Sequence, residues 1–186
     1  DKIMFTGSSA TGAKIAAAAA RNLTPTTIEL GGNDAAIVLP DADPKAIAMD
    51  LFWGAFLNMG QTCACAKRLY VPDALHDAVV AELKAIAEAM PMGDGAQPGI
   101  AMGPIQNRMQ FDKVRRLVDE ARAGGATIVC GGEPRAGAGN FYPLTLVTDI
   151  ADGASLVDEE QFGPVLPVIR YRDIDDAIAQ ANRVDV

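Results

Sequence analysis

Apolar and polar residues along the chain recur with two periods, one typical of β-strands and the other of α-helices. Short apolar runs, several of them rich in β-branched residues, predict strands at about 2–6, 26–30, 35–39, 68–71, 126–130, 144–148 and 165–171. Apolar residues three and four positions apart predict helices at about 13–22, 44–57, 73–90, 107–123 and 174–182. Because strands and helices alternate throughout, we expect an α/β fold with a largely parallel sheet flanked by helices.

Glycine and proline divide this pattern into segments. Asp43 and Pro44 form a cap and first helical position, and the pair Gly124-Gly125 stops the helix that precedes it. Residues 93–103 and 131–140 are rich in glycine or proline and are expected to be loops. The pair Gly31-Gly32 is interpreted as a domain junction, with one domain at 1–31 and a second at 32–186.

Composition excludes several classes of protein. The 186 residues are 49% hydrophobic and 22% charged, as in a globular protein with a real core. The net charge of −8 argues against nucleic acid and anionic membranes as partners. No apolar run approaches the roughly 20 residues of a membrane span. Both ends interrupt a predicted element, so we expect a piece of a longer protein.

Cysteine and histidine are too few for a disulfide framework or a metal site. The three cysteines, Cys63, Cys65 and Cys130, are an odd number, and the first two are too close for an unstrained bridge. With one histidine, His76, and no CxxC pair, we expect no zinc site. A reducing cytoplasm fits this usage. Cys130 is expected in the core, and His76 on the surface of its helix.

The segment Gly60-Gln61-Thr62-Cys63 follows a strongly apolar helix and is the first candidate for chemistry. A cysteine on such a turn can attack a carbonyl as its thiolate, with nearby backbone N–H groups holding the oxyanion. The alternative is a cysteine that only packs, because most buried cysteines do. Upstream, Glu29 ends a short strand before Gly31-Gly32, where a carboxylate tends to point into a cleft and can serve as a base.

The N-terminal strand runs into Gly7-Ser8-Ser9-Ala10-Thr11-Gly12 and then an alanine-rich helix. A strand, a glycine-hydroxyl turn and a helix can present backbone N–H groups to a phosphate. The GxGxxG fingerprint and the Walker lysine are both absent, so an ordinary helix capped by Ser8 remains the alternative.

Four segments in order resemble the NAD(P)-dependent aldehyde dehydrogenase superfamily: Phe5-Thr6-Gly7-Ser8, Glu29-Leu30-Gly31-Gly32, Gly60-Gln61-Thr62-Cys63 and Glu160-Gln161-Phe162-Gly163-Pro164. The resemblance covers the whole chain. It implies that residues 1–31 are the last βαβ piece of a Rossmann-like NAD(P)-binding domain. Residues 32–186 would be a catalytic domain truncated at its C-terminal end.

The resemblance also implies a role for each matching residue. Cys63 would be the nucleophile that attacks an aldehyde, and Glu29 the base that activates water to hydrolyse the thioester. The cofactor, NAD or NADP, would be bound by the following residues: Thr6, Gly7, Ser8, Gly12, Leu30, Glu160 and Phe162. Without the Phe-Gly-Pro that follows it, Glu160 would be read as a solvated loop acid. The full-length protein would be a homodimer or homotetramer acting on a small aldehyde.

Two functions from other classes stay open. A cofactor-independent cysteine hydrolase could use Cys63, but His76 would be its only histidine base and lies on a polar helix face. A non-catalytic module is the third reading of the isolated chain, because the oxyanion-hole asparagine of the superfamily would lie upstream of Asp1. A backbone N–H near Cys63 could supply one oxyanion donor, and losing one such donor costs about a hundredfold or more in rate.

Overall fold

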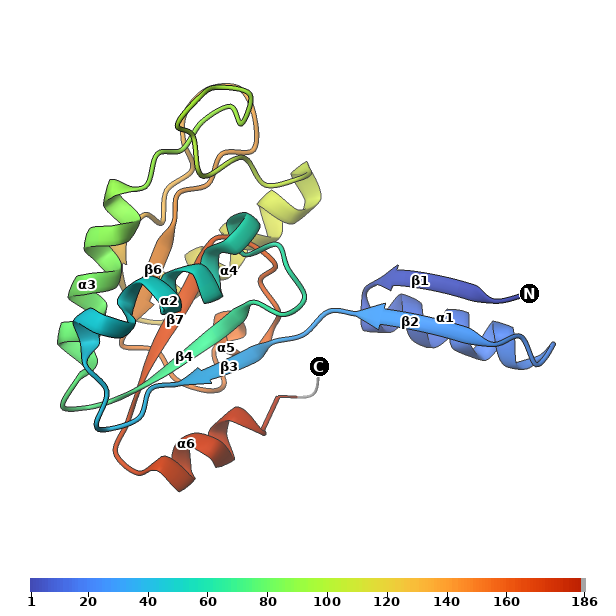
Figure 1. The fold of residues 1–186 in the computed structure, drawn as a ribbon, viewed down its shortest axis with the longest axis horizontal. Helices are drawn as coiled ribbons and strands as arrows, with labels where there is room; N and C mark the ends of the chain where they lie inside the picture. Colours follow the sequence, from blue (N-terminus) through green and yellow to red (C-terminus); the bar gives the residue numbers. More distant parts are fainter. Residues whose placement is uncertain (185–186) are drawn as a thin grey trace. The chain divides into compact units, whose positions relative to one another are not determined.

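The computed structural model describes residues 1–184, which form two compact units, Asp1–Gly32 and a larger one from Asn33 onward. The last two residues of the predicted range 32–186 lie outside the described part. The first unit is a βαβ piece with strands β1 (Ile3–Gly7) and β2 (Thr26–Leu30) and helix α1 (Ser9–Ala20) (Figure 1). The two strands are parallel, with Thr6 opposite Glu29 and Gly7 opposite Leu30.

Helix α1 begins at Ser9, four residues before the predicted start, because Ser8 is its N-cap. The Ser8 hydroxyl accepts a hydrogen bond from the Thr11 amide at 3.3 Å, and the Thr11 and Gly12 amides donate to the Ser8 carbonyl. Gly12 is buried against β2, where an added Cβ would come within 2.5 Å of a Leu30 methyl group. Glycine at this position therefore allows the helix to lie close to its sheet.

The second unit contains a five-stranded sheet in the order β3-β4-β7-β6-β5. The strands are β3 (Asp34–Ile37), β4 (Ala66–Pro72), β5 (Thr127–Cys130), β6 (Thr145–Thr148) and β7 (Val165–Tyr171). All neighbouring pairs are parallel except β5 and β6, which are antiparallel. The predicted α/β fold with a largely parallel sheet is confirmed, with one antiparallel edge strand.

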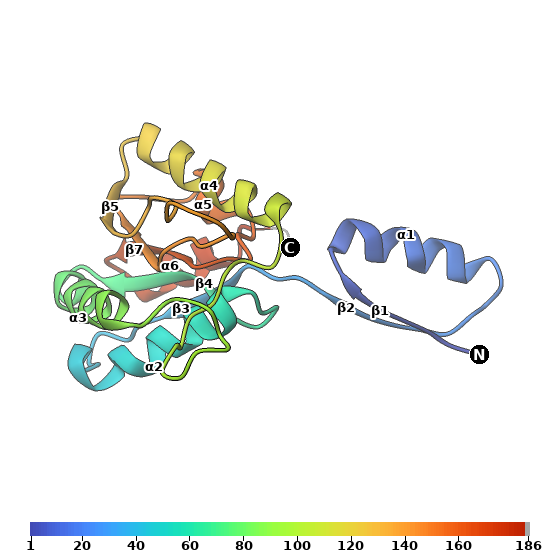
Figure 2. The same ribbon diagram turned by 90° about the horizontal axis from the view of Figure 1, so that it is seen from above.

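Helices cover both faces of this sheet, as Figure 2 shows. They are α2 (Pro44–Phe56), α3 (His76–Ala89), α4 (Arg108–Ala123), α5 (Ser155–Asp158) and α6 (Ile174–Ala181). Alternate residues of β4 serve the two faces: Leu69 and Val71 pack in one core with α2 and α3, and Tyr70 packs in another with α6. The strand is therefore almost fully buried, as expected of a central parallel strand.

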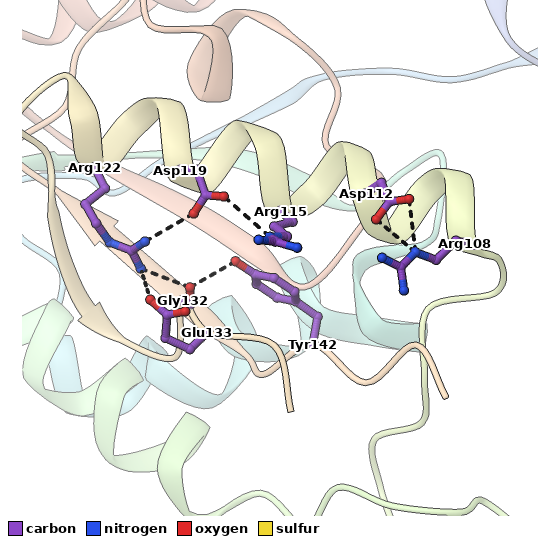
Figure 3. A network of polar contacts seen from close by, with 8 residues as sticks. All are labelled: Arg108, Asp112, Arg115, Asp119, Arg122, Gly132, Glu133 and Tyr142. Carbon is purple, nitrogen blue, oxygen red and sulfur yellow. Dashed lines mark hydrogen bonds and ion pairs between the residues drawn. The ribbon is translucent and has the colours of Figure 1, made fainter. Parts of the chain in front are cut away.

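Helix α4 has an apolar face and a charged face. Phe111, Val114 and Leu117 pack in the core, together with Tyr142. On the other face, Figure 3 shows a row of Arg–Asp pairs, among them Arg108–Asp112 at 2.9 Å and Arg115–Asp119 at 3.6 Å. Such exposed (i, i+4) pairs each stabilise a helix by only about 0.3–0.5 kcal/mol.

The end of α4 is tied to the loop between β5 and β6. Arg122 forms ion pairs with Asp119 at 3.1 Å and Glu133 at 2.8 Å, and its guanidinium also donates to the Gly132 carbonyl (Figure 3). Tyr142 donates its hydroxyl proton to the same carbonyl at 3.2 Å. Burial raises the pKa of Tyr142 well above its ordinary value.

Two predictions about single residues need correction. His76 was expected on the surface, but it is 2% exposed, and its Nε2 lies 3.4 Å from the Val168 carbonyl of β7. The helix begins at His76 rather than near Asp73, so its first side chain lies over β7 instead of facing water. Cys130, expected in the core, is half-buried at the end of β5 and packs against the core from its margin.

Candidate active site

The loop that carries Cys63 and the loop that carries Glu160 meet at one end of the five-stranded sheet, where β4 and β7 begin. Strands β4 and β7 are parallel neighbours, with Leu69 opposite Val168, so the segments that precede them lie at the same edge. One of these segments carries Cys63, and the other is the run 160–164. They are in direct contact, because an added Cβ on Gly60 would lie only 2.3 Å from the Gly163 carbonyl oxygen. Only glycine at position 60 permits this approach.

The turn before Cys63 has an unusual backbone. After α2 the chain forms a short 3-10 helix, η1 (Leu57–Gly60), in which Asn58, Met59 and Gly60 have φ angles of 52°, 62° and 68°. Left-handed backbone in non-glycine residues is costly and persists only where the surroundings enforce it. Here Met59 is 2% exposed and anchors the turn in the core.

Reciprocal side-chain bonds lock the same turn. The Asn58 amide donates to the Gln61 carbonyl at 3.2 Å, and the Gln61 amide donates to the Asn58 carbonyl at 3.1 Å. The Gln61 side-chain oxygen also accepts a bond from the Gln106 backbone at 2.8 Å. The glutamine of the Gly-Gln-Thr-Cys motif is therefore a structural clamp for the turn that presents Cys63.

The three cysteines differ in exposure. Cys63 is exposed, Cys130 is half-buried, and Cys65 is 2% exposed with its Sγ donating to the Leu57 carbonyl at 3.7 Å. Burial raises the pKa of the Cys130 thiol. Cys63 is the cysteine most accessible to an electrophile from solvent.

A buried lysine, which the sequence analysis did not single out, lies beneath this turn. Lys67 is the second residue of β4 and is 1% exposed, and its ammonium group donates a hydrogen bond to the Gly60 carbonyl. The same Nζ lies 5.6 Å from the centre of the Phe162 ring. Burial lowers the pKa of Lys67, and nearby Cys65 and Glu160 oppose that effect.

The loop that carries Glu160 and Phe162 is held from both sides. Gln161 is fully buried, and its side-chain amide donates to the carbonyls of Lys67 at 3.1 Å and Leu156 at 2.7 Å. From α4, the Gln110 amide donates to the Gln161 carbonyl at 2.5 Å. Glu160 and Phe162 on either side are partly exposed, and Phe162 has a φ of 46°. Gln161 thus fixes the loop and directs its neighbours outward.

The same loop is also anchored to the charged face of α4. Arg116 forms ion pairs with Glu120 at 3.0 Å and with Glu159 at 2.9 Å. These hydrogen bonds raise the pKa of Arg116 and lower that of Glu120. An added Cβ on Gly163 would lie 2.4 Å from a Val114 methyl group, so this loop packs tightly on the helix.

The remaining predicted site residues belong to the first unit. Thr6 and Ser8 are exposed, Gly7 and Leu30 are partly buried, and Glu29 is exposed on β2. The further residue, Gly12, is buried in α1. The structure thus gathers Cys63, Glu160 and Phe162 around one sheet edge, and gathers the other candidates at the ends of β1 and β2 and the start of α1.

The described part of the chain offers neither a metal site nor a membrane span. Within residues 1–184, no group of three or more His, Cys, Asp or Glu side chains has an arrangement that could hold a metal ion. None of the helices in that range is long and apolar enough to cross a membrane.

Known proteins resemble the chain along its whole length. It is 45% identical over 181 residues to a probable aldehyde dehydrogenase of a Pseudomonas species, covering 97% of this chain and 37% of that protein. It is 37% identical to the NADP(+) succinate-semialdehyde dehydrogenase of Escherichia coli K12, covering 97% of this chain and 38% of that protein. The structure of an NAD+ complex of a Bacillus cereus aldehyde dehydrogenase is 34% identical, with a TM-score of 0.94, covering 99% of this chain and 38% of that one.

The chain therefore spans less than two fifths of the length of these relatives. The family profile described as "Aldehyde dehydrogenase family" matches residues 1–186. The resemblance carried by the four motifs is confirmed: this chain belongs to the aldehyde dehydrogenase family.

Proposed function

We propose that this chain is part of a longer enzyme that oxidises an aldehyde to a carboxylic acid with NAD or NADP. Residues 1–31 would be the end of its coenzyme-binding domain, and residues from 32 onward would belong to its catalytic domain. The observation that carries the proposal is the exposed Cys63 on a turn locked against the Glu160 loop. A nucleophile needs access to substrate and a fixed position, and this turn supplies both.

In this reaction the Cys63 thiolate attacks the aldehyde carbon, and an S–C bond forms while the carbonyl oxygen becomes an oxyanion. Backbone N–H groups of the rigid turn around Cys63 are donors of the kind that stabilise such an oxyanion. Loss of a hydride from the same carbon, for which bound NAD or NADP would be the acceptor, would leave a thioester on Cys63. Glu29 then takes a proton from water, and the water attacks the thioester, releasing the acid and the Cys63 thiolate.

Residues in each of the two units suit a part of a dinucleotide. The first helical hydrogen bonds of α1 are donated by Thr11 and Gly12, so the preceding amides of Ser9 and Ala10 lie at the open N-terminus of a twelve-residue helix. No acidic residue lies in its first turn, and such an end favours a phosphate. Glu160 offers two carboxylate oxygens, which suit the paired hydroxyls of a ribose. Phe162 beside it supplies an aromatic surface.

The proposed substrate is a small aldehyde, in keeping with the names of the relatives, which include a semialdehyde dehydrogenase. The proposed cofactor remains NAD or NADP. A homodimer or homotetramer in the cytoplasm remains our expectation for the full-length protein. The cysteine hydrolase alternative loses its base, because His76 is buried against β7 and bound to Asp77 at 3.2 Å.

The test uses the full-length protein with a set of aldehydes and either NAD or NADP, following the absorbance of the reduced nicotinamide. We expect reduction that depends on both the aldehyde and the cofactor, and that is lost in Cys63→Ala. Equal activity in Cys63→Ala would overturn the assignment of the nucleophile. Aldehyde-independent chemistry at Cys63 without any nicotinamide reduction would overturn the proposed reaction.

A further inference from the structure

We propose that Gln161 is a positioning residue for cofactor binding, whose side chain sets the loop from which Glu160 and Phe162 would contact NAD or NADP. The inference rests on the proposed role of those two residues in holding the cofactor. It assigns a part in that binding to a side chain that is itself fully buried.

The amide nitrogen of Gln161 makes both of its side-chain hydrogen bonds. The groups that face it are carbonyl oxygens, of Lys67 at 3.1 Å and of Leu156 at 2.7 Å, so only a donor fits between them. Within residues 1–184 the side-chain oxygen of Gln161 has no hydrogen-bond partner. A carboxylate of the same shape would face the two carbonyl oxygens with no proton to donate.

The two acceptors belong to packed elements far from the loop in sequence or in structure. Lys67 is the second residue of β4, and Leu156 lies in α5. Because both are backbone atoms of elements that pack in the core, they hold the Gln161 side chain in one place. The backbone at position 161 is held with it.

A third bond fixes the same residue from α4. The Gln110 amide donates to the Gln161 carbonyl at 2.5 Å and so fixes the peptide plane between Gln161 and Phe162. Phe162 has a φ of 46°, a left-handed backbone that a non-glycine residue keeps only where its surroundings enforce it. Directly after it, an added Cβ on Gly163 would lie 2.4 Å from a Val114 methyl group. The direction of Phe162 is therefore imposed from both sides.

The neighbours of Gln161 show the consequence of this anchoring. Glu160 and Phe162 are both partly exposed, and the fully buried Gln161 lies between them. A carboxylate binds a pair of ribose hydroxyls only when its oxygens are aligned with them, and each hydrogen bond to a charged group is worth roughly a factor of ten or more. Release of the loop should therefore weaken cofactor binding on the order of tenfold.

Gln161→Met in the full-length protein tests this, because methionine keeps the length of the side chain without a donor. We expect its dissociation constant for NAD or NADP, measured by calorimetry, to rise on the order of tenfold. Without cofactor, hydrogen exchange followed by mass spectrometry should be faster in residues 159–163 of the variant. The KM for the aldehyde should stay near the wild-type value, because the bonds within the Cys63 turn do not involve Gln161.

Three further variants separate hydrogen bonding from the filling of space. Gln161→Glu keeps the shape but turns a carboxylate toward two carbonyl oxygens, so it should weaken cofactor binding more than Gln161→Met does. Gln110→Leu removes the bond to the Gln161 carbonyl and should also weaken binding; it serves as the test if the Gln161 variants do not fold. Gln97→Met is the matched control, because Gln97 is exposed in the loop before α4, and it should bind the cofactor as the wild type does.

The outcomes are distinct. A wild-type dissociation constant in folded Gln161→Met would overturn the proposal even if urea denaturation shows a loss of stability, because the residue would then be only structural. Equal weakening in Gln97→Met would overturn it too, as would wild-type binding in Gln110→Leu if neither Gln161 variant folds. A protein that oxidises no aldehyde but binds NAD or NADP, with the expected losses in the variants, would refute the proposed reaction while supporting the role of Gln161. A wild-type protein that binds neither cofactor would overturn both.

Discussion

Replacing Gly60 with alanine should damage the site in a way that the structure allows us to estimate. Gly60 has a φ of 68°, and the new Cβ would lie 2.3 Å from the Gly163 carbonyl oxygen and 3.2 Å from the Ala55 carbonyl oxygen. Real Cβ atoms essentially never come within 3.0 Å of such a neighbour, so one of the two loops must move. The neighbouring atom is backbone, which cannot rotate away as a side chain does.

Two costs add. A left-handed conformation in a residue with a Cβ costs about 1–2 kcal/mol. Forcing a methyl group into a packed contact costs about another 1–3 kcal/mol. We therefore expect the free energy of unfolding to fall by about 2–5 kcal/mol. If the turn moves by about 1 Å instead, turnover should fall on the order of a hundredfold, because a nucleophile misplaced by that distance loses its attack geometry.

Gly54→Ala is the matched control. Gly54 lies in the last turn of α2, six residues earlier, and nothing lies within 4 Å of an added Cβ. Alanine there should stabilise the helix by about 0.5–1 kcal/mol and leave turnover unchanged. Urea denaturation and steady-state kinetics of the full-length protein measure both effects. A Gly60→Ala variant as stable and as active as the wild type would refute the contact between the two loops.

Three further predictions concern the thiols, the buried glutamine and the chain by itself. At neutral pH Cys63 should be alkylated before the other two cysteines. The alkylation rate of Cys130 should rise only as the pH approaches its raised pKa. Peptide mapping that finds Cys130 labelled first at neutral pH would contradict this. Gln161→Leu strands the buried carbonyls of Lys67 and Leu156, so unfolding in urea should show a loss of about 2–4 kcal/mol, and an unchanged midpoint would show that these bonds contribute nothing. The isolated 186-residue chain should bind NAD with a dissociation constant of roughly millimolar or weaker, because it contains few of the βα units that normally hold a dinucleotide. Calorimetry that gives a micromolar dissociation constant would disprove this.

The sequence predicts much of this fold because its elements carry local signals. The helix that begins after Asn107 is an example: Asn107 caps it through a 2.8 Å bond to the Gln110 amide, and Gly124 ends it, as the residue types indicate. The antiparallel pairing of β5 and β6 could also have been predicted from the sequence. No helix-forming segment lies between Cys130 and Thr145, and a parallel connection requires a crossover.

The supporting residues of the site were not predictable, because their roles depend on partners far away in sequence. A lysine or glutamine side chain normally faces water. Gln161 is buried because its side chain bonds the Lys67 carbonyl, 94 positions away, and Lys67 is buried beneath the Cys63 turn, where its ammonium group bonds the Gly60 carbonyl. His76 was misplaced for the same reason, since its partner, Val168, is 92 residues away. Motifs identified the residues expected to react, but tertiary contacts determine which side chains hold them in place.

The most direct test of the proposed chemistry is to trap its covalent intermediate. Glu29→Gln in the full-length protein removes the proposed base for hydrolysis of the thioester but leaves the thiol free to react. Mixed with aldehyde and cofactor, this variant should give one burst of reduced nicotinamide followed by very slow turnover. Mass spectrometry should then find an acyl group in place of the thiol proton on the peptide that contains Cys63. Turnover at the wild-type rate without an adduct, or an acyl group on Cys65 or Cys130 instead, would contradict the account.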